Sequence, residues 1–540
     1  MENVIALEEL EQNKDVGSEE RKTQAQILVG LASDMLLFYD EQGSAYAKVK
    51  VKNHHEIWPI RSSDLKLILI GRYLELNEDK APGGQAMSDA LTALEAKARI
   101  HGEKSNVHVR IAETEDAIYL DLCNEEWQVV EIKKEGWQVV DESPVYFKRS
   151  RIMQPIAAPT KNGRVEDLKP FINFNDESDY KLIIAWLLST FKEDSPFPIL
   201  TIQGEQGSSK STTTKVLRAL IDPSSLPLRA LPKDEKDLAI AANNTWILAF
   251  DNLSGLSNPM SDALAKLSTG GGLATRKLYS DDEESVFQIM RPAILNGIDD
   301  IGKRQDLLDR SIVINLPSIP ESKRTDEKTF WKEFNSKKSD ILGALCTIIS
   351  GALARLPTTT LASKPRMADF ALWITAAEKS LEWHPGEFMA IYNSNRDKAI
   401  DQGLESDPFA TAVMELIKRN DEWIGNASQL LSEAARFADE RTTRSNAWPT
   451  ARSVRNRLRR INPALKKKSI LYVEWENKMS KTLKLAIIND DKSKTSPLDY
   501  DEEKTSSLLK VSDTKANDDN DDNDDNSSLL LLEQEEDLVL

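Results

Sequence analysis

The segment that most constrains the fold is an apolar run that leads into a glycine-containing loop and then into a helical stretch. Pro198–Gln203 (PILTIQ) has the apolar composition of a buried strand, and Thr212–Ile221 has that of a helix. The loop between them, Gly204–Ser211, has the sequence GEQGSSKS. A strand, a glycine-containing loop and a helix in this order predict an α/β unit whose helix N-terminus faces an anion.

The loop follows the pattern G-x-x-x-x-G-K-[ST], except that Ser209 replaces its second glycine. In this pattern backbone N–H groups surround the phosphates, Lys210 reaches the β- and γ-phosphates, and the Ser211 hydroxyl binds Mg²⁺. Gly207 is expected to restore part of the backbone freedom that Ser209 removes. The alternative is a glycine-rich turn that merely connects strand to helix. The predicted nucleotide contacts are Gly204, Glu205, Gln206, Gly207, Ser208, Ser209, Lys210, Ser211 and Thr212.

Two further apolar strands favour the nucleotide-binding interpretation. Thr245–Phe250 (TWILAF) runs into Asp251, and Pro292–Leu295 runs into Asn296. An aspartate at such a strand end is expected to hold the Mg²⁺ shell, and an asparagine to touch the γ-phosphate or its attacking water. The predicted catalytic residues here are Lys210, Asp251 and Asn296, and the predicted metal ligands are Ser211 and Asp251.

The residue after the aspartate departs from the commonest ATPase pattern. Many such enzymes carry a second acid there to activate water, and this chain has Asn252. Either another acid, such as Glu205, serves as the base, or hydrolysis is slow. The sequence leaves both alternatives open.

An arginine stands just before the last apolar strand of this region. Asp306–Arg310 (DLLDR) precedes Ser311–Leu316. From the edge of the domain Arg310 can reach the nucleotide of a neighbouring subunit as an arginine finger, so we predict it as a fourth catalytic residue and expect an oligomer. The alternative is a surface pair of Arg310 with Asp309 or Asp306.

A second basic feature lies between the two polar strand ends. Gly270–Gly272 is followed by Arg276 and Lys277 and then by the acidic run Asp281–Glu284, which suggests a β-hairpin with a polar turn. Such a hairpin can project Arg276 and Lys277 into a central pore to grip single-stranded DNA. A solvated hairpin tip is an equal alternative.

Charge is unevenly distributed along the 540 residues, whose net charge is −18. Residues 441–484 hold 13 basic and 2 acidic side chains, whereas residues 490–540 hold 17 acidic and 5 basic ones. Phosphates respond to the local patch rather than to the whole-chain sum. The composition therefore permits a DNA-binding module followed by a disordered acidic tail, whose final Leu-rich stretch could dock a partner.

The basic module has the pattern of a winged helix. Helices are expected at Ala410–Lys418 and Ala427–Ala438, with a third starting at Trp448-Pro449, and strands at Ile470–Trp475 and Thr482–Ile487. In the third helix an apolar stripe lies opposite a basic face. The stripe is Val454, Leu458 and Ile461, and the face predicted to bind duplex DNA is Arg452, Arg455 and Arg459. A merely solvated charged face is the alternative.

The rest of the chain divides by composition into further regions. Before the central α/β region we expect strands at Met35–Tyr39, Leu65–Ile70, Val107–Ile111 and Ala117–Leu122, and a helix at Met87–Ile100. The predicted regions are a mobile N-terminus (1–25), an N-terminal α/β accessory domain (26–150), a linker (151–179), the α/β ATPase core (180–320), a helical region (321–406), the winged helix (407–488) and the tail (489–540).

Cysteine and hydropathy patterns exclude several classes of protein. Two cysteines and five histidines give neither a disulfide framework nor a metal-ligand cluster, which fits a reducing cytosol. No apolar run approaches the roughly 18–20 residues that a membrane span requires, and the acidic N-terminus is unlike a signal peptide. We therefore expect a cytoplasmic protein without a membrane partner.

These motifs together resemble those of superfamily 3 helicases and their relatives from phages, plasmids and integrated elements. Gly204–Ser211 resembles motif A, Asp251 motif B, Arg276–Tyr279 motif B′ and Asn296 motif C, and the Asp306–Arg310 segment resembles the arginine-finger segment of hexameric helicases of the AAA+ class. The resemblance implies a P-loop NTPase core that uses ATP and Mg²⁺ to move on and unwind DNA. It also implies a homo-oligomer such as a hexamer, often beside a primase or initiator. Without unwinding, the chain would be an ATP-switched initiator or regulator.

Overall fold

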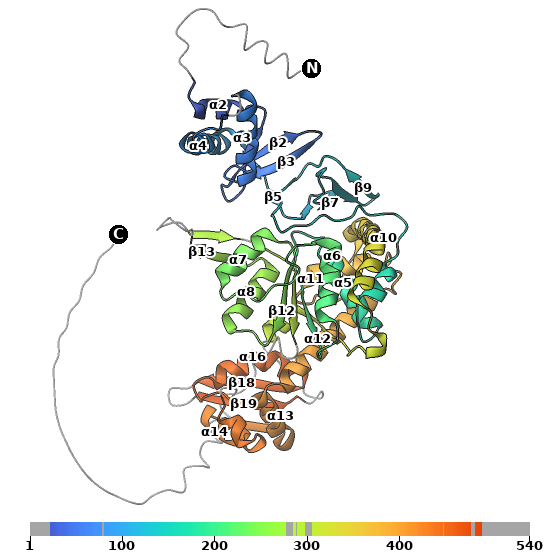
Figure 1. Ribbon diagram of the computed structural model, residues 1–540. Helices are drawn as coiled ribbons and strands as arrows, with labels where there is room; N and C mark the ends of the chain where they lie inside the picture. The colour runs from blue at the N-terminus through green and yellow to red at the C-terminus, as the bar shows by residue number, and fades with distance from the viewer. Residues whose placement is uncertain are drawn as a thin grey trace, which may run out of the picture.

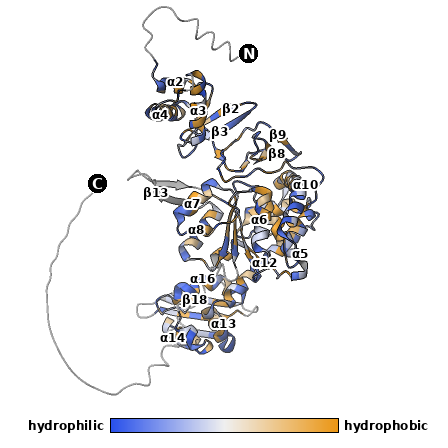
Figure 2. Ribbon diagram, viewed as in Figure 1, coloured by the Kyte–Doolittle hydropathy of each residue, from blue (hydrophilic) through white to orange (hydrophobic). Residues whose placement is uncertain are grey.

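The computed structural model describes residues 22–77, 80–276, 284–287, 289–297, 305–445, 448–476 and 481–488. The predicted tail and most of the predicted mobile N-terminus lie outside these residues. The described chain is mixed α/β and extends from N-terminal helices at one end, through a central parallel sheet, to a C-terminal module at the other (Figure 1). Figure 2 shows that hydrophobic residues are frequent in the helices beside this sheet, including α6.

The N-terminal region begins with a four-stranded sheet of order β3-β2-β1-β4 beside three helices. The strand expected at Met35–Tyr39 and the helix expected at Met87–Ile100 are confirmed. The elements are α2 (Gln24–Gly30), β1 (Leu36–Tyr39), β2 (Ala45–Val51), β3 (His54–Pro59), α3 (Ser63–Leu76), α4 (Gly84–His101) and β4 (Glu103–Lys104).

The strand expected at Leu65–Ile70 is wrong, because these residues belong to helix α3. Ser62 caps the helix by accepting a hydrogen bond from the backbone N–H of Leu65 at 3.1 Å. Leu65, Leu69 and Tyr73 are buried at helical spacing, so one face of α3 packs into the core. A short, mostly apolar run does not reveal this period by itself.

A second antiparallel sheet, of order β6-β7-β8-β9, follows. The strand expected at Ala117–Leu122 is confirmed as β7, but the one expected at Val107–Ile111 is two strands. Arg110 breaks it with a φ of 66°, and its buried guanidinium donates to Asp222 at 3.2 Å. The elements are β5 (Val107–His108), β6 (Ile111–Glu113), β7 (Ala117–Asp121), β8 (Val129–Lys133), β9 (Gly136–Val140) and β10 (Tyr146–Phe147), with β5 and β10 paired in parallel.

The segment predicted as a linker, 151–179, packs closely against the rest of the protein. It contains helix η1 (Val165–Phe171) and the start of α5 (Glu177–Ser189). Its apolar side chains Met153, Ile156 and Leu168 are buried in the largest hydrophobic cluster.

A four-stranded parallel sheet of order β12-β15-β11-β16 forms the centre of the protein. Its strands alternate with helices, which confirms the predicted parallel arrangement. The elements are β11 (Ile199–Gln203), α6 (Lys210–Ile221), α7 (Glu235–Asn244), β12 (Leu248–Leu253), α8 (Asn258–Thr269), β15 (Ala293–Gly297), α9 (Gln305–Leu308) and β16 (Ser311–Asn315). The predicted hairpin is also confirmed, as β13 (Leu273–Arg276) paired antiparallel with β14 (Glu284–Phe287).

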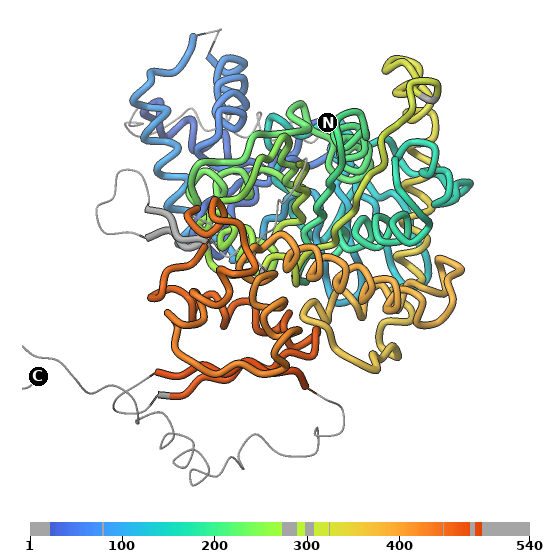
Figure 3. Tube along the Cα trace, turned by 90° about the horizontal axis from the view of Figure 1, so that it is seen from below, coloured from blue at the N-terminus to red at the C-terminus, as the bar shows by residue number. Residues whose placement is uncertain are grey.

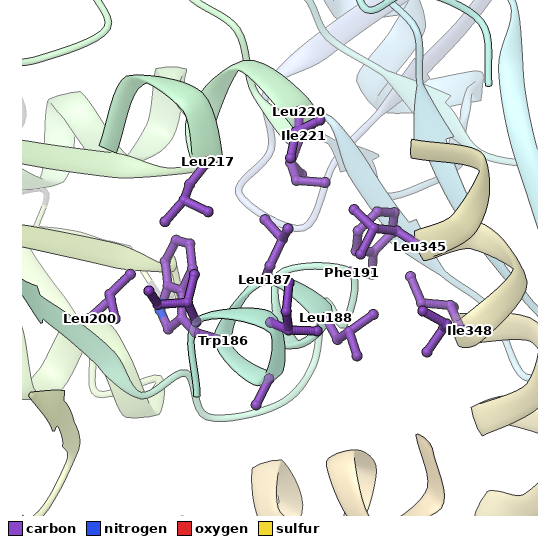
Figure 4. Packing of buried hydrophobic residues seen from close by; sticks show 14 of the residues in the cluster. Trp186, Leu187, Leu188, Phe191, Leu200, Leu217, Leu220, Ile221, Leu345 and Ile348 are labelled. Atoms are coloured by element: carbon purple, nitrogen blue, oxygen red, sulfur yellow. The ribbon is translucent and has the colours of Figure 1, made fainter. Parts of the chain in front are cut away.

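Helix α5 lies between the sheet and the long helix α10 (Glu327–Arg355) and is buried on nearly every side. Figure 4 shows Trp186 near Leu200 of β11, and Leu188 and Phe191 near Leu345 and Ile348 of α10. Full burial of each such side chain contributes about 1.5–3 kcal/mol. The other elements here are η2 (Glu321–Lys323), η3 (Leu356–Thr358), α11 (Ala368–Ala377) and α12 (Glu387–Glu405).

Among the described helices, one passes a length-and-composition test for crossing a membrane. It covers Glu327–Thr358, and 56% of its most apolar window is buried inside the protein. Because that apolar face is already packed against the core, the test is weak evidence for a membrane span.

The C-terminal module has its own hydrophobic cluster and a three-stranded antiparallel sheet of order β17-β19-β18. The helices expected at Ala410–Lys418 and Ala427–Ala438 and both expected strands are found, with β17 in addition. The elements are α13 (Pro408–Asn420), β17 (Glu422–Gly425), α14 (Ala427–Ala434), η4 (Ala435–Phe437), α15 (Glu440–Thr443), α16 (Val454–Lys467), β18 (Ile470–Glu476) and β19 (Lys481–Ile487). Seen from below, the module lies beside the helices that precede it, including α12 (Figure 3).

The third helix of this module does not begin at Trp448 as predicted, but at Val454. The backbone N–H of Ser453 donates to the carbonyl of Thr450 at 2.9 Å, and its hydroxyl accepts from the N–H of Thr450, which closes a turn before the helix. Trp448 instead packs edge-on against Phe409 with ring centroids 5.5 Å apart.

Candidate nucleotide-binding site

The Gly204–Ser211 loop joins the end of β11 to the start of α6 and needs unusual backbone angles. Gly207 has a φ of 84° and Ser209 one of 62°. Ser209 thus adopts the left-handed conformation that the second glycine of the motif ordinarily supplies, at a cost of roughly 1–2 kcal/mol. A Cβ on Gly204 would lie 2.6 Å from the carbonyl oxygen of Leu316, so a larger residue there requires the backbone to move.

Lys210 is the first residue of α6 and folds back over the loop. Its Nζ donates to the carbonyl oxygens of Gly204 at 2.6 Å and Glu205 at 2.8 Å. The N-terminus of α6 opens at the same place and carries the positive end of the helix dipole. A cation and unpaired helix N–H groups around one loop suit a phosphate.

Four side chains form a continuous hydrogen-bonded row behind the loop. The Ser211 hydroxyl donates to Asp251 Oδ2 at 2.9 Å, and Asn296 Nδ2 donates to Asp251 Oδ1 at 3.1 Å. Buried Thr214, one turn further along α6, donates to Asn296 Oδ1 at 2.9 Å. Asn296 is completely buried, so its orientation is held by these partners. Thr214 has no motif signal in the sequence beyond sharing a helix face with Ser211.

The row includes the oxygen groups that a Mg²⁺ ion would take. Mg²⁺ is usually held by one or two carboxylates together with waters and substrate phosphates, and rarely by an all-protein cage. Ser211 Oγ and Asp251 Oδ2 are adjacent and belong to this donor class. No group of three or more His, Cys, Asp or Glu suited to a metal occurs in the part of the chain that the structure describes.

Asn252 leaves the regular strand at the position of the missing acid. Its φ is 57°, and the pairing of β12 with β15 shifts between Phe250 and Leu253. Its side chain is exposed. Glu205, the other acid near the loop, accepts a hydrogen bond from the Ser318 hydroxyl at 3.1 Å.

Asn173 is a loop contact without a motif signal in the sequence. Its Nδ2 donates to the carbonyl oxygens of Ser208 at 3.0 Å and Pro317 at 2.7 Å. One side chain therefore joins the loop to the segment that follows β16.

A cavity of about 620 Å³ lies at the carboxyl end of β16, between the start of α5 and α12. Its walls include apolar Leu182, Leu316 and Ile391, and polar Asp179 and Lys398. The N–H of Leu316 donates to the residue just before the loop at 2.8 Å, so this wall continues into the loop. Burial, reinforced by the neighbouring Asp176 carboxylate, raises the pKa of Asp179 to about 6.

Arg310 lies at the amino-terminal end of the strands, whereas the loop lies at their carboxyl-terminal end. Its carbonyl oxygen accepts from the N–H of Ile199, the first residue of β11, whereas the loop begins after the last residue. Five strand residues at about 3.3 Å each separate the two ends of β11 by roughly 16 Å. Asp309, one of the acids expected to pair with Arg310, faces Arg396 at 3.6 Å and Arg366 at 4.0 Å.

The predicted DNA contacts are distributed over two places. Arg276 ends β13, and its side chain and Lys277 lie outside the described residues. In the C-terminal module Arg452 and Arg459 are exposed and Arg455 is half-buried. Arg459 pairs with Glu474 of β18 at 2.5 Å.

The lysines at the end of α16 hold the module to its neighbour. Lys467 pairs with Asp397 and Lys468 with Asp401 at 2.8 Å, and both acids belong to α12. These two charges are therefore engaged within the protein, and the more available basic residues lie towards the start of α16.

Comparison with protein families covers both the candidate site and the C-terminal module. Residues 165–383 match the family described as actinomycete integrative conjugative element replication protein, and residues 409–502 match the C-terminal domain of the same family. The two matches cover more than half of the chain. The chain belongs to this family of replication proteins. The predicted class, a replication protein of a mobile element, is confirmed.

The replication protein also has weak likenesses to solved structures. One, titled "SCCmec type IV Cch - active helicase", is 13% identical with a TM-score of 0.47 and covers 84% of this chain and 93% of that one. Another, the apo NrS-1 C-terminal region, is 14% identical with a TM-score of 0.39 and covers 87% and 100%. Both TM-scores lie below 0.5, so the fold of this replication protein stands on its own geometry. No curated protein sequence matches it.

Proposed function

We propose that this replication protein is an ATP-driven DNA helicase or translocase that works as an oligomer, with a P-loop core related to superfamily 3 and AAA+ helicases. The observation that carries the proposal is the row Ser211–Asp251–Asn296 directly behind the Lys210 loop. A hydroxyl in the first turn of α6, with a carboxylate and an amide from two parallel strands, suits the hydrolysis of a nucleoside triphosphate.

ATP is proposed to bind with its phosphates in the Gly204–Ser211 loop. Lys210 would exchange its carbonyl partners for phosphate oxygens, and Ser211 and Asp251 would hold Mg²⁺. When bound, Mg²⁺ neutralises charge on the phosphates. Asn296, fixed by Thr214, would hold the attacking water or the γ-phosphate. The base and ribose would occupy the cavity beside Leu316, whose apolar walls and polar rim suit a purine.

Arg310 is proposed to act on the nucleotide of a neighbouring subunit. Its location at the amino end of β16, roughly 16 Å from its own loop, supports action between subunits rather than within one. Such a shared site fits a ring, and the β13–β14 hairpin would then present Arg276 and Lys277 to single-stranded DNA.

The C-terminal module is proposed to be a winged helix that binds duplex DNA. Its order of helix α13, strand β17, three further α-helices and a β18–β19 hairpin supports this, as do the exposed basic residues of α16. Arg452 and Arg455 would contact phosphates, and Arg459 would exchange Glu474 for DNA.

Asn252 favours a second candidate, an ATP-switched initiator without unwinding activity. An amide at that position cannot accept a proton from water as a carboxylate does. The two functions differ in ATPase rate with and without single-stranded DNA. Strong stimulation that Lys210→Ala abolishes supports the motor, whereas ATP binding without DNA-dependent turnover supports the switch and contradicts the motor.

A further inference from the structure

The segment that follows β16 runs along the Gly204–Ser211 loop and touches it repeatedly. Leu316 bonds to the residue before the loop at 2.8 Å, and the N–H of Ile319 donates to the carbonyl of Gly207 at 3.3 Å. Between them, the Ser318 hydroxyl donates to Glu205. Because these three contacts are spaced along the loop, they hold the segment and the loop side by side.

Arg324 stands at the end of this segment, over the middle of the loop. A Cβ built on Gly207 would lie 3.2 Å from Arg324 Nη2, so the guanidinium rests directly on the loop backbone. Its side chain is 54% exposed. The carboxylate of Glu321 is 3.9 Å away and 91% exposed, which makes it a loose surface partner of small energetic value.

The positive groups around the loop favour a bound anion. Lys210 and Arg324 are both cations, and the N-terminus of α6 adds a further positive end. Cations that gather around one loop repel each other less when a negative group binds among them. The planar guanidinium offers paired N–H donors that match phosphate oxygens.

We propose that Arg324 binds the phosphates of the nucleotide in cis, in the same subunit as Lys210. The inference rests on the proposed function, in which the loop holds a nucleoside triphosphate. Arg324 thereby contacts the nucleotide bound by its own subunit, whereas Arg310, at the amino-terminal end of β16, contacts the nucleotide of the neighbouring subunit.

Binding of a fluorescent ATP analogue, and its displacement by inorganic tripolyphosphate, tests the contact. Arg324→Ala is expected to weaken both by about tenfold, and Arg324→Lys by less because it keeps a point charge. Arg61→Ala is the matched control, since Arg61 is 59% exposed and pairs with Glu95 far from the loop. Tripolyphosphate affinity at the wild-type value in Arg324→Ala overturns the inference. If Lys210→Ala also binds tripolyphosphate as the wild type does, the phosphate loop itself is refuted.

Mixed oligomers distinguish action in cis from action in trans. Lys210→Ala mixed with Arg324→Ala should recover no ATPase activity, because every site then lacks one of two groups from the same subunit. Arg310→Ala mixed with Arg324→Ala should recover part of it, because some sites regain all three groups. Recovery in the first mixture would overturn the cis assignment.

Discussion

The Ser211 hydroxyl donates a 2.9 Å hydrogen bond to the carboxylate of Asp251, which lies 40 residues further along the chain. The other oxygen of that carboxylate accepts from Asn296 at 3.1 Å. These contacts exist because β11, β12 and β15 are parallel, so that their carboxyl-terminal ends lie side by side. The groups suited to Mg²⁺ and to water thus meet where α6 begins.

Replacing the Asp251 carboxylate should separate metal binding from nucleotide binding. Asp251→Asn keeps the shape but removes the charge that would hold Mg²⁺, so ATPase activity is expected to fall by about a hundredfold. A Mg²⁺ titration of ATPase activity measures the loss. Binding of ATP in the presence of EDTA should stay near the wild-type value. An unchanged Mg²⁺ dependence would contradict the role of Asp251.

Subunits that carry different defects should complement each other if Arg310 acts across an interface. Lys210→Ala and Arg310→Ala are each expected to lower ATPase activity. For Arg310→Ala, which removes the finger, the loss is expected to be at least about a thousandfold. Mixed oligomers should regain part of the activity, because some sites combine an intact loop with an intact finger. No recovery in oligomers shown to be mixed would count against action in trans.

Asn252 is expected to limit turnover if hydrolysis needs a second acid. Asn252→Asp restores a carboxylate and suits the φ of 57°, because aspartate and asparagine tolerate the left-handed region. We expect kcat to rise several-fold with little change in melting temperature. A kcat that stays constant, together with a loss of activity in Glu205→Gln, would assign the base to Glu205 instead.

Duplex binding should depend on Arg452, just before α16, and on Arg455 in its first turn. Arg452→Ala with Arg455→Ala is expected to reduce the slope of log K against log salt by about two, one for each lost phosphate contact. Lys467→Ala is the control, since Lys467 pairs with Asp397 within the protein. An equal slope in the double variant and the wild type, measured by fluorescence anisotropy, would refute the assigned face.

Asp179 should make stability depend on pH. Its folded pKa of about 6 exceeds the ordinary carboxyl value of 3.8, since burial and Asp176 disfavour the charge more than Lys398 supports it. The unfolded chain therefore ionises first, and stability is lost as pH rises from about 4 to about 6. Asp179→Asn should flatten the melting temperature across this window. An identical pH profile for variant and wild type would exclude Asp179 as the source.

Much of the central region follows from local sequence patterns. Apolar runs before the loop, before Asp251 and before Asn296 predicted parallel strands, and β11, β12 and β15 are found there. Burial on both faces makes such strands continuously apolar, which is why they can be recognised. The error at Leu65–Ile70 arose in a similar way, because this mostly apolar run belongs to helix α3, in which only Leu65 and Leu69 of the run are buried.

The sequence by itself determined which chemical groups stand at the strand ends, since strand, loop and helix signals are local. Only the tertiary structure decided which distant groups join them. Asn173 reaches Pro317, 144 residues away, and Arg324 rests on Gly207. Arg310 lies at the amino-terminal end of β16, away from the loop of its own subunit. Such contacts depend on how strands order within a sheet and how connections return over it, and no periodicity along the chain records that packing.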